Sequence, residues 1–122
     1  MAVNGDTARG VTALVQVGDP YTYFSGRPLH VAEDVALDDG TLGAAVLRRS
    51  APPDVPTVLL RLFAKRLRVA KHRQVSAWNG IRHVECASGD GRPIPLQVDG
   101  DYIGDAVQAR YEVVPGGLTV VC

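Results

Sequence analysis

Two aspartates, Asp99 and Asp101, stand on either side of Gly100 near the C-terminal end of the chain. Carboxylates placed so close together can act as a general base or bind a divalent cation. Asp99-Gly100 is also a strong signal for a two-residue type I′ hairpin turn, because both central residues need a positive φ. Two interpretations stay open: a solvated turn, or a catalytic carboxylate that faces something outside this chain.

The acidic segment Glu33–Gly40 is the densest group of carboxylates in the sequence. It does not match a calcium-binding loop, which needs acids at alternate positions and a Glu six residues after the Gly. Asp34, Asp38 and Asp39 could still supply oxygen ligands to Mg²⁺ or Ca²⁺. The other interpretation is an acidic loop that ends in a turn at Gly40.

Basic residues are concentrated in the middle of the chain, although the 13 Lys and Arg balance the 13 Asp and Glu. Residues 55–84 contain no acid. Balanced totals argue against a nucleic-acid binder, whereas this block could meet an anionic membrane surface or a partner protein. The alternative is that this separation of basic and acidic residues only gives the domain an ordinary dipole and marks no binding surface. The side chains that would contact a membrane are Arg61, Lys65, Arg68 and Lys71.

Other motifs that carry chemistry are missing from the sequence. The stretch Ser88–Arg92 is rich in glycine but leads into a strand pattern, so it predicts a hairpin turn and not a phosphate loop. The histidines and serines show no metal-binding or triad spacing, and we expect each imidazole to be exposed or packed. Cys86 and Cys122 are expected to be free thiols. The sequence therefore contains no cradle for nucleotide phosphates.

The elements that position these residues are mostly short strands. Apolar residues alternate with polar ones, and turn residues separate the segments, which predicts a mainly β fold, an antiparallel sandwich or open barrel. Trp78 and Tyr111 are expected in its core. Asn79-Gly80 is expected to be a turn. The strand candidates are 11–17, 21–24, 29–32, 42–47, 75–78, 81–87, 94–99, 102–103, 107–114 and 118–121.

One amphipathic helix is predicted at about residues 54–69, with Asp54 as its N-cap. Its apolar face, which we expect to face the core, comprises Val55, Val58, Leu59, Leu62 and Phe63. Arg66 falls within that face, so either the helix ends near it or the guanidinium has an acidic partner.

The length of 122 residues favours one domain, 11–122, preceded by an N-terminal segment, 1–10, that is either a frayed start or the remnant of a strand. The sequence shows neither a secretion signal nor an apolar run long enough to span a membrane. We therefore predict a cytoplasmic protein.

Several ordered motifs resemble the C-terminal domain of the diacylglycerol kinase and sphingosine kinase family of lipid kinases. The family has a Gly-rich stretch, then P-D-A-x-x-D-D-G-x-L-D, and ends in V-x-P-x-x-L-x-V. The corresponding segments here are Tyr21–Gly26, Ala32–Leu42, Lys71-His72, Gln97–Asp101 and Val113–Val120.

The resemblance implies that this chain receives the lipid, while a separate N-terminal domain of the same enzyme holds ATP through a G-G-D-G-T motif. Asp99 would be the general base for a diacylglycerol-like or sphingosine-like hydroxyl, and Asp101 would assist. Asp34, Asp38 and Asp39 would correspond to a Mg²⁺ site. The chain alone is expected to be inactive, and its complete enzyme is expected to sit peripherally at the inner membrane face.

The sequence departs from the family pattern at several positions. Gly18-Asp19 replaces the usual Asn-Gly, Glu33 replaces Pro, and Gly43 stands where the acidic motif normally ends in Asp. Asp101 is one methylene shorter than the usual Glu, a change of about 1 Å that matters in a positioned site. These departures bear on the metal site and on activity more than on the fold.

Overall fold

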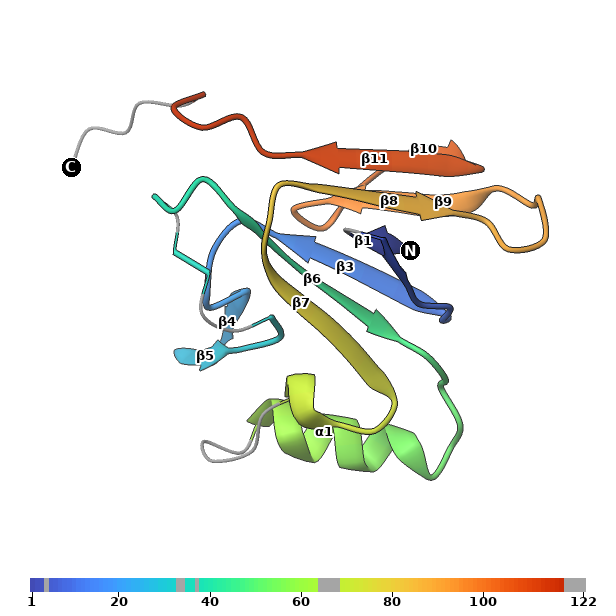
Figure 1. The fold of residues 1–122 in the computed structure, drawn as a ribbon. Helices are drawn as coiled ribbons and strands as arrows, with labels where there is room; N and C mark the ends of the chain where they lie inside the picture. The colour runs from blue at the N-terminus through green and yellow to red at the C-terminus, as the bar shows by residue number, and fades with distance from the viewer. Residues whose placement is uncertain (4, 33–34, 37, 64–68, 118–122) are drawn as a thin grey trace.

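The computed structural model describes residues 1–3, 5–32, 35–36, 38–63 and 69–117. This part of the chain is mainly β with antiparallel sheets and one α-helix, α1 (Asp54–Phe63), as the sequence predicts (Figure 1). A 3₁₀ turn, η1 (Val69–Lys71), follows the helix. The strands are β1 (Ala2–Val3), β2 (Asp6–Thr7), β3 (Thr12–Gln16), β4 (Thr22–Phe24), β5 (Arg27–Leu29), β6 (Leu42–Leu47), β7 (Val75–Ile81), β8 (His83–Ala87), β9 (Ile94–Val98), β10 (Asp101–Ala106) and β11 (Gln108–Glu112). The last predicted strand, 118–121, and Cys122 lie outside the described residues.

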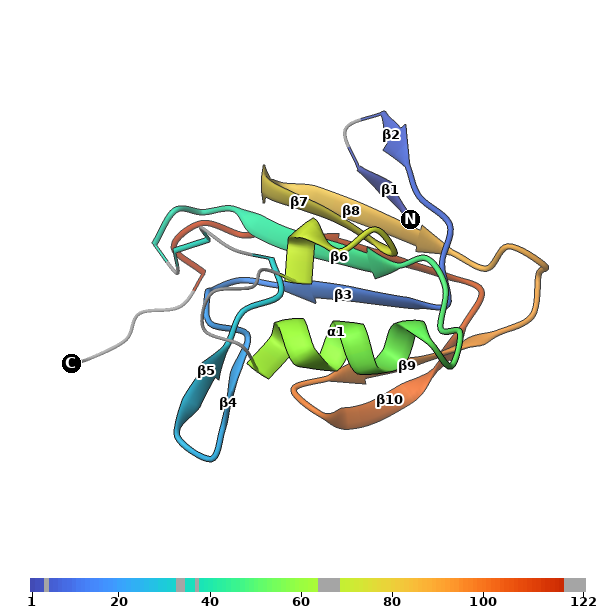
Figure 2. The same ribbon diagram turned by 90° about the horizontal axis from the view of Figure 1, so that it is seen from below.

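Two sheets build the body of the fold, and the hydrophobic core lies where they meet. Their strand orders are β11-β8-β1-β2 and β3-β6-β7, and the chain passes from one to the other at Arg82, between β7 and β8. Trp78 and Tyr111 pack against the core, as predicted. Two further hairpins, β4–β5 and β9–β10, each pair only within themselves, and Figure 2 shows β4–β5 projecting from the body. The core comprises Val3, Leu42, Ala44, Ile81, Val84 and Cys86.

The first residues of the chain take part in this core. Val3 is 1% exposed, and β1 pairs with β8 through Ala2 and Glu85. The segment therefore forms short strands, and the frayed start is wrong. A two-residue strand is too short to show periodicity, so the sequence pattern could not decide between them.

The Asn79-Gly80 pair does not form the predicted turn. Strand β7 continues through it to Ile81, and Gly80 has a φ of 65°. Leu42 pairs with Ile81 and Ala44 with Trp78, so two residues of β7 stand opposite one of β6. The pair forms a bulge, a feature that uses the same left-handed glycine as a tight turn.

Helix α1 begins where the sequence predicts, but its described part ends earlier. Asp54 lies within the first turn and is not the N-cap, because the amides of Asp54 and Val55 both donate to the carbonyl oxygen of Ala51, at 2.9 and 3.3 Å. Val69, the predicted last residue, belongs to η1. Residues 64–68, with Arg66 among them, lie outside the described residues.

The apolar face predicted for α1 is only partly buried where the structure describes it. Val55 and Leu59 are 41% and 46% exposed, whereas Val58 is half-buried. The side chains of Leu62 and Phe63 lie outside the described part of the structure, and Leu60, beyond the predicted face, is 61% exposed. The opposite side of the helix, with Asp54 and Thr57, makes polar contacts to the segment that follows η1. Hydrophobic periodicity located the helix but did not predict these polar contacts.

Gln16 holds two loops against the end of β3. It is 5% exposed, and its Nε2 donates to the carbonyl oxygens of Gly18 at 2.9 Å and of Ala32 at 2.6 Å. The first loop leads to β4 and the second to the acidic segment, so a buried amide holds the start of both.

Replacing Gln16 with Leu should destabilise the fold. The side chain keeps its volume, but two carbonyls lose their donor, and each such loss costs about 1–3 kcal/mol when the group is buried. Urea denaturation should show a lower free energy of unfolding than the wild type. Gln97→Leu on exposed β9 is the matched control and should change little. Equal stability of the two variants would contradict this role.

Candidate functional site

The β9–β10 hairpin carries the two aspartates as predicted. Asp101 pairs with Val98, which leaves Asp99-Gly100 as a two-residue loop, and their φ angles of 52° and 91° are those of a type I′ turn. Both Asp99 and Asp101 are exposed. The hairpin thus presents two carboxylates at its tip on a backbone with little freedom.

Apolar side chains surround these carboxylates on the same hairpin. Val98, Tyr102 and Ile103 are 49%, 61% and 60% exposed. The register shifts between Tyr102 and Gly104, so Ile103 occupies a bulge. A carboxylate pair next to exposed apolar groups suits a substrate with a polar head and an apolar chain.

Tyr102 is tied to the strand beyond the bulge. Its hydroxyl donates to Oδ1 of Asp105 at 2.9 Å. This bond is the main cause that raises the pKa of Tyr102 above its ordinary value, because it stabilises the neutral phenol and the carboxylate repels a phenolate.

Asp105→Asn should lower the pKa of Tyr102. The amide cannot repel the phenolate, so the phenol should ionise at a lower pH than in the wild type. A pH titration of the tyrosine ring signals by NMR measures this, with Tyr102→Phe identifying the signal. Unchanged titration in Asp105→Asn would show that the hydrogen bond is not formed in solution.

The acidic segment supplies few ligands within the described residues. Asp38 is exposed, and Oδ2 of Asp39 already accepts the amide of Ala36 at 3.0 Å. Asp34 lies outside the described residues. Among those that are described, no three His, Cys, Asp or Glu side chains gather as metal ligands. The Mg²⁺ site stays a prediction, and we derive no chemistry from it.

Gly43 explains one departure from the family motif. A Cβ at this position would lie 2.8 Å from Cβ of Ala32 and 2.9 Å from Cγ2 of Val35. The close packing leaves no room for a side chain. The carboxylate that ends the motif elsewhere is therefore excluded here by sterics.

The glycine-rich stretch Ser88–Arg92 is closed on itself, but it is not the predicted hairpin turn. Strand β8 pairs with β1 and β11, and β9 pairs with β10, so the stretch connects strands of two different sheets. Oδ1 of Asp90 accepts the hydroxyl of Ser88 at 2.9 Å and the amide of Arg92 at 3.1 Å. The Arg92 amide is the largest of the influences that lower the pKa of Asp90. These groups bind one another and form no phosphate cradle.

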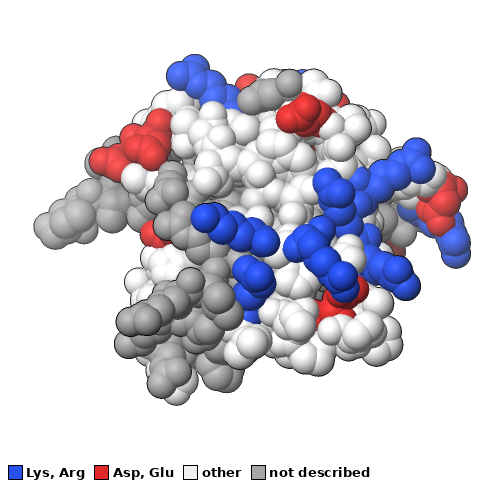
Figure 3. Space-filling view, turned by 60° about the horizontal axis from the view of Figure 1, so that its bottom comes forward, with Lys and Arg blue, Asp and Glu red and all other residues white. Residues whose placement is uncertain are grey.

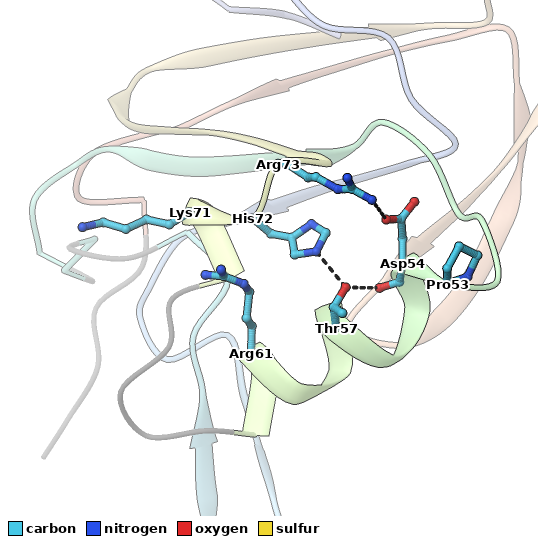
Figure 4. A pocket seen from close by; sticks show the side chains of 7 residues that line it. All are labelled: Pro53, Asp54, Thr57, Arg61, Lys71, His72 and Arg73. Atoms are coloured by element: carbon cyan, nitrogen blue, oxygen red, sulfur yellow. Dashed lines mark hydrogen bonds and ion pairs between the residues drawn. The ribbon is translucent and has the colours of Figure 1, made fainter.

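A second candidate site lies between α1 and the segment that follows η1 (Figure 4). Asp54 is 4% exposed, and its Oδ1 accepts Nη2 of Arg73 at 2.7 Å. The hydroxyl of Thr57 donates to the carbonyl oxygen of Asp54 at 2.8 Å, so it must accept from Nε2 of His72, 2.9 Å away. Nδ1 of His72 accepts the amide of Gln74 at 3.1 Å. The imidazole is therefore neutral, with its proton on Nε2.

These residues form the wall of an open pocket of about 340 Å³ with an excess of positive charge. Of the predicted membrane contacts, Arg61 and Lys71 line it, whereas Lys65 and Arg68 lie outside the described residues. Lys and Arg side chains gather on the face of the molecule shown in Figure 3. The pocket is lined by Pro53, Asp54, Thr57, Arg61, Lys71, His72 and Arg73.

Sequence reasoning missed the connection between Thr57, His72 and Arg73. His72 is packed, in line with one of the two expectations for an imidazole, but its partner lies 15 residues away and follows no periodic pattern. The available signal was Asp54, the acid that immediately precedes the acid-free basic block. A single carboxylate that is followed in the sequence by many cations and no other acid indicates that it forms an ion pair with one of them.

Comparison with protein-family models, with curated proteins and with solved structures finds no match to this chain. Within the described ranges, no helix is both long and apolar enough to cross a membrane.

Proposed function

We propose that this chain is the lipid-receiving domain of an ATP-dependent lipid kinase. Asp99 is the general base that removes the proton from the lipid hydroxyl as the oxygen attacks the γ-phosphorus of ATP. Asp101 assists by orienting the hydroxyl. The observation that carries the proposal is the exposed carboxylate pair at the tip of a type I′ hairpin, next to exposed apolar side chains.

The backbone of the turn suits a general base that must meet a substrate from outside. Asp99 has a φ of 52°, a conformation in which Asp and Asn are favoured over most residues. A carboxylate fixed in this way needs little reorganisation, and positioning is the main contribution of protein groups to phosphoryl transfer. Val98 and Ile103 provide apolar surface for the lipid chain beside it.

ATP and Mg²⁺ belong to the other half of the proposed enzyme. The metal neutralises charge on the transferred phosphoryl group when it is bound. The sequence of this chain contains no phosphate loop, and its glycine-rich stretch is a closed turn. The nucleotide is therefore assigned to a partner domain, and the lipid to this one.

Asp99→Asn should reduce turnover by orders of magnitude in a polypeptide that joins this chain to its ATP-holding domain. Asn tolerates the left-handed turn, so the hairpin should persist while the base is lost. Lipid phosphorylation with ATP measures the effect on diacylglycerol and on sphingosine. Asp6→Asn, an exposed aspartate on β2, is the matched control.

Three results would contradict this assignment. Near-normal turnover of Asp99→Asn would remove its role as base. A larger loss in Asp101→Asn than in Asp99→Asn would exchange the roles of the two aspartates. Tight binding of ATP by the isolated chain would contradict the division of the substrates between two domains.

A second candidate function is the docking of α1 on an anionic membrane, favoured by the orientation of the helix. Its ridge of Val55, Leu59 and Leu60 is exposed, and Arg61 and Lys71 lie nearby on the pocket. Apolar groups that enter the lipid interface, with cations that meet anionic headgroups, are the two components of interfacial binding. A lipid kinase must also reach its membrane, so the two functions are compatible.

Vesicle binding should depend on both components. The chain should sediment with vesicles that contain phosphatidylglycerol, and added salt should weaken the binding because the headgroup attraction is screened. Lys71→Glu and Leu60→Asp should each reduce the bound fraction. Arg110→Glu on β11 and Val107→Asp are the matched controls for charge and for apolar exposure. Equal losses in the controls, or no binding at all, would exclude docking by α1.

A further inference from the structure

We propose that the inner face of the β9–β10 hairpin binds the apolar chain of the lipid substrate, and that this chain lies along β9 from the turn toward Ile94. The inference rests on the proposed function, because it takes the tip of the hairpin as the place that receives the lipid hydroxyl. It goes further by assigning the direction of the lipid chain and the class of lipid. The inner face comprises Ile94, Leu96 and Val98 of β9 with Asp101, Gly104 and Ala106 of β10.

The pairing of the two strands defines the faces of the hairpin. Residues directly opposite each other share a face, and side chains alternate along each strand. Val98 opposes Asp101 next to the turn. Two residues further along β9, Leu96 opposes Gly104, so both pairs share one face. The inner-face residues beyond the first pair are half-buried, whereas the outer face is exposed at each position: Pro95, Gln97, Tyr102 and Asp105.

The bulge at Ile103 maintains this division of faces along β10. Residues three apart on a regular strand point to opposite faces, so Tyr102 and Asp105 would be on different sides of the sheet. The extra residue places both on the outer face, where the hydroxyl of Tyr102 donates to Oδ1 of Asp105 at 2.9 Å. The hydrogen bond thus spans the bulge, and Asp101 and Gly104 stay on the inner face.

The inner face is largely apolar but takes no part in the hydrophobic core. The hairpin pairs only within itself, and within the described part of the chain the core cluster includes none of its residues. Because Gly104 has no side chain, Leu96 has no cross-strand partner on this face. The strip from Ile94 to Val98 is about 13 Å long, at about 3.3 Å per residue. A hydrocarbon chain that covers it would remove apolar surface from water.

The position of Asp101 gives the direction of the lipid chain. Its carboxylate stands at the end of the apolar strip, on the same face as Val98, which is 49% exposed. On the outer face, three of the four residues carry polar groups: Gln97, Tyr102 and Asp105. A lipid whose hydroxyl reaches the carboxylates at the tip therefore finds a continuous apolar surface on the inner face alone.

The charges of the hairpin select a lipid without a phosphate group. Residues 93–109 contain three aspartates, Asp99, Asp101 and Asp105, and no Lys, Arg or His. These carboxylates repel an anionic headgroup, whereas an uncharged alcohol carries nothing to repel. The same repulsion favours release of the lipid once it is phosphorylated. The class of lipid is therefore an uncharged alcohol of the diacylglycerol type.

The first test uses the 122-residue chain, ¹³C-labelled in its methyl groups, with dihexanoylglycerol below the concentration at which this lipid aggregates. NMR should show saturable shifts of the methyl signals of Ile94, Leu96 and Val98, with intermolecular NOEs to the acyl chain. The ring signals of Tyr102, on the outer face, should shift less. Dihexanoyl phosphatidate should bind about tenfold more weakly, because its phosphate meets like charges at close range.

Val98→Asn should weaken the binding of dihexanoylglycerol about threefold to tenfold, since about half of one apolar side chain is left to be covered by the ligand. Val107→Asn is the matched control, because Val107 is 52% exposed and lies just outside the hairpin. Both side chains are exposed, so neither change removes a core contact. Leu96→Asn is a second inner-face variant and should also weaken binding.

The wild type alone can overturn the inference. Shifts that do not saturate would do so, as would NOEs to Tyr102 in place of the inner-face methyls. Equal affinity of Val98→Asn and Val107→Asn would also remove the inner face as the site. Binding of dihexanoyl phosphatidate that is as tight as that of dihexanoylglycerol would refute the assigned class of lipid.

Turnover of the polypeptide that joins this chain to its ATP-holding domain separates the inference from the proposed function. Val98→Asn should raise KM for dioctanoylglycerol with little change in kcat, whereas Asp99→Asn should lower kcat. Binding on the inner face without any lipid phosphorylation would refute the kinase and support the lipid site. Phosphorylation with an unchanged KM in Val98→Asn would refute the lipid site and leave the kinase.

Discussion

The ion pair between Asp54 and Arg73 determines how helix α1 lies on the domain. A carboxylate that is 4% exposed must be compensated, because an unpaired buried charge is costly. The partner comes from the segment before β7, so the contact ties the first turn of the helix to that segment. Val55, Leu59 and Leu60 then face outward. The same contact forms part of the wall of the pocket that Arg61, Lys71 and His72 also line.

The two candidate sites are held by different kinds of constraint. At the β9–β10 hairpin the constraint is local, because Asp99 and Gly100 both adopt a positive φ within a two-residue turn. At the basic pocket it is non-local, because Thr57 and His72 meet across 15 residues. A general base needs exposure and a fixed direction, which a turn provides. The pocket brings together side chains from two separate segments, which requires contacts between those segments to hold them.

This difference explains how much the sequence could predict. The strand at 42–47 and the Asp99-Gly100 turn were found as expected, since both depend on neighbouring residues. Asn79-Gly80 was misread because a bulge and a hairpin turn use the same left-handed glycine. The rotation of α1 and its contact with His72 depend on pairings between distant polar groups, which hydrophobic periodicity does not encode.

The charges of α1 stabilise both the helix and its contact with the segment before β7. Asp54 lies in the first turn of the helix and Arg61 in the last described turn, so both charges are favourable to the helix dipole. Asp54 also binds the guanidinium of Arg73, at 2.7 Å. One buried carboxylate therefore contributes both to the helix and to its attachment to the rest of the domain.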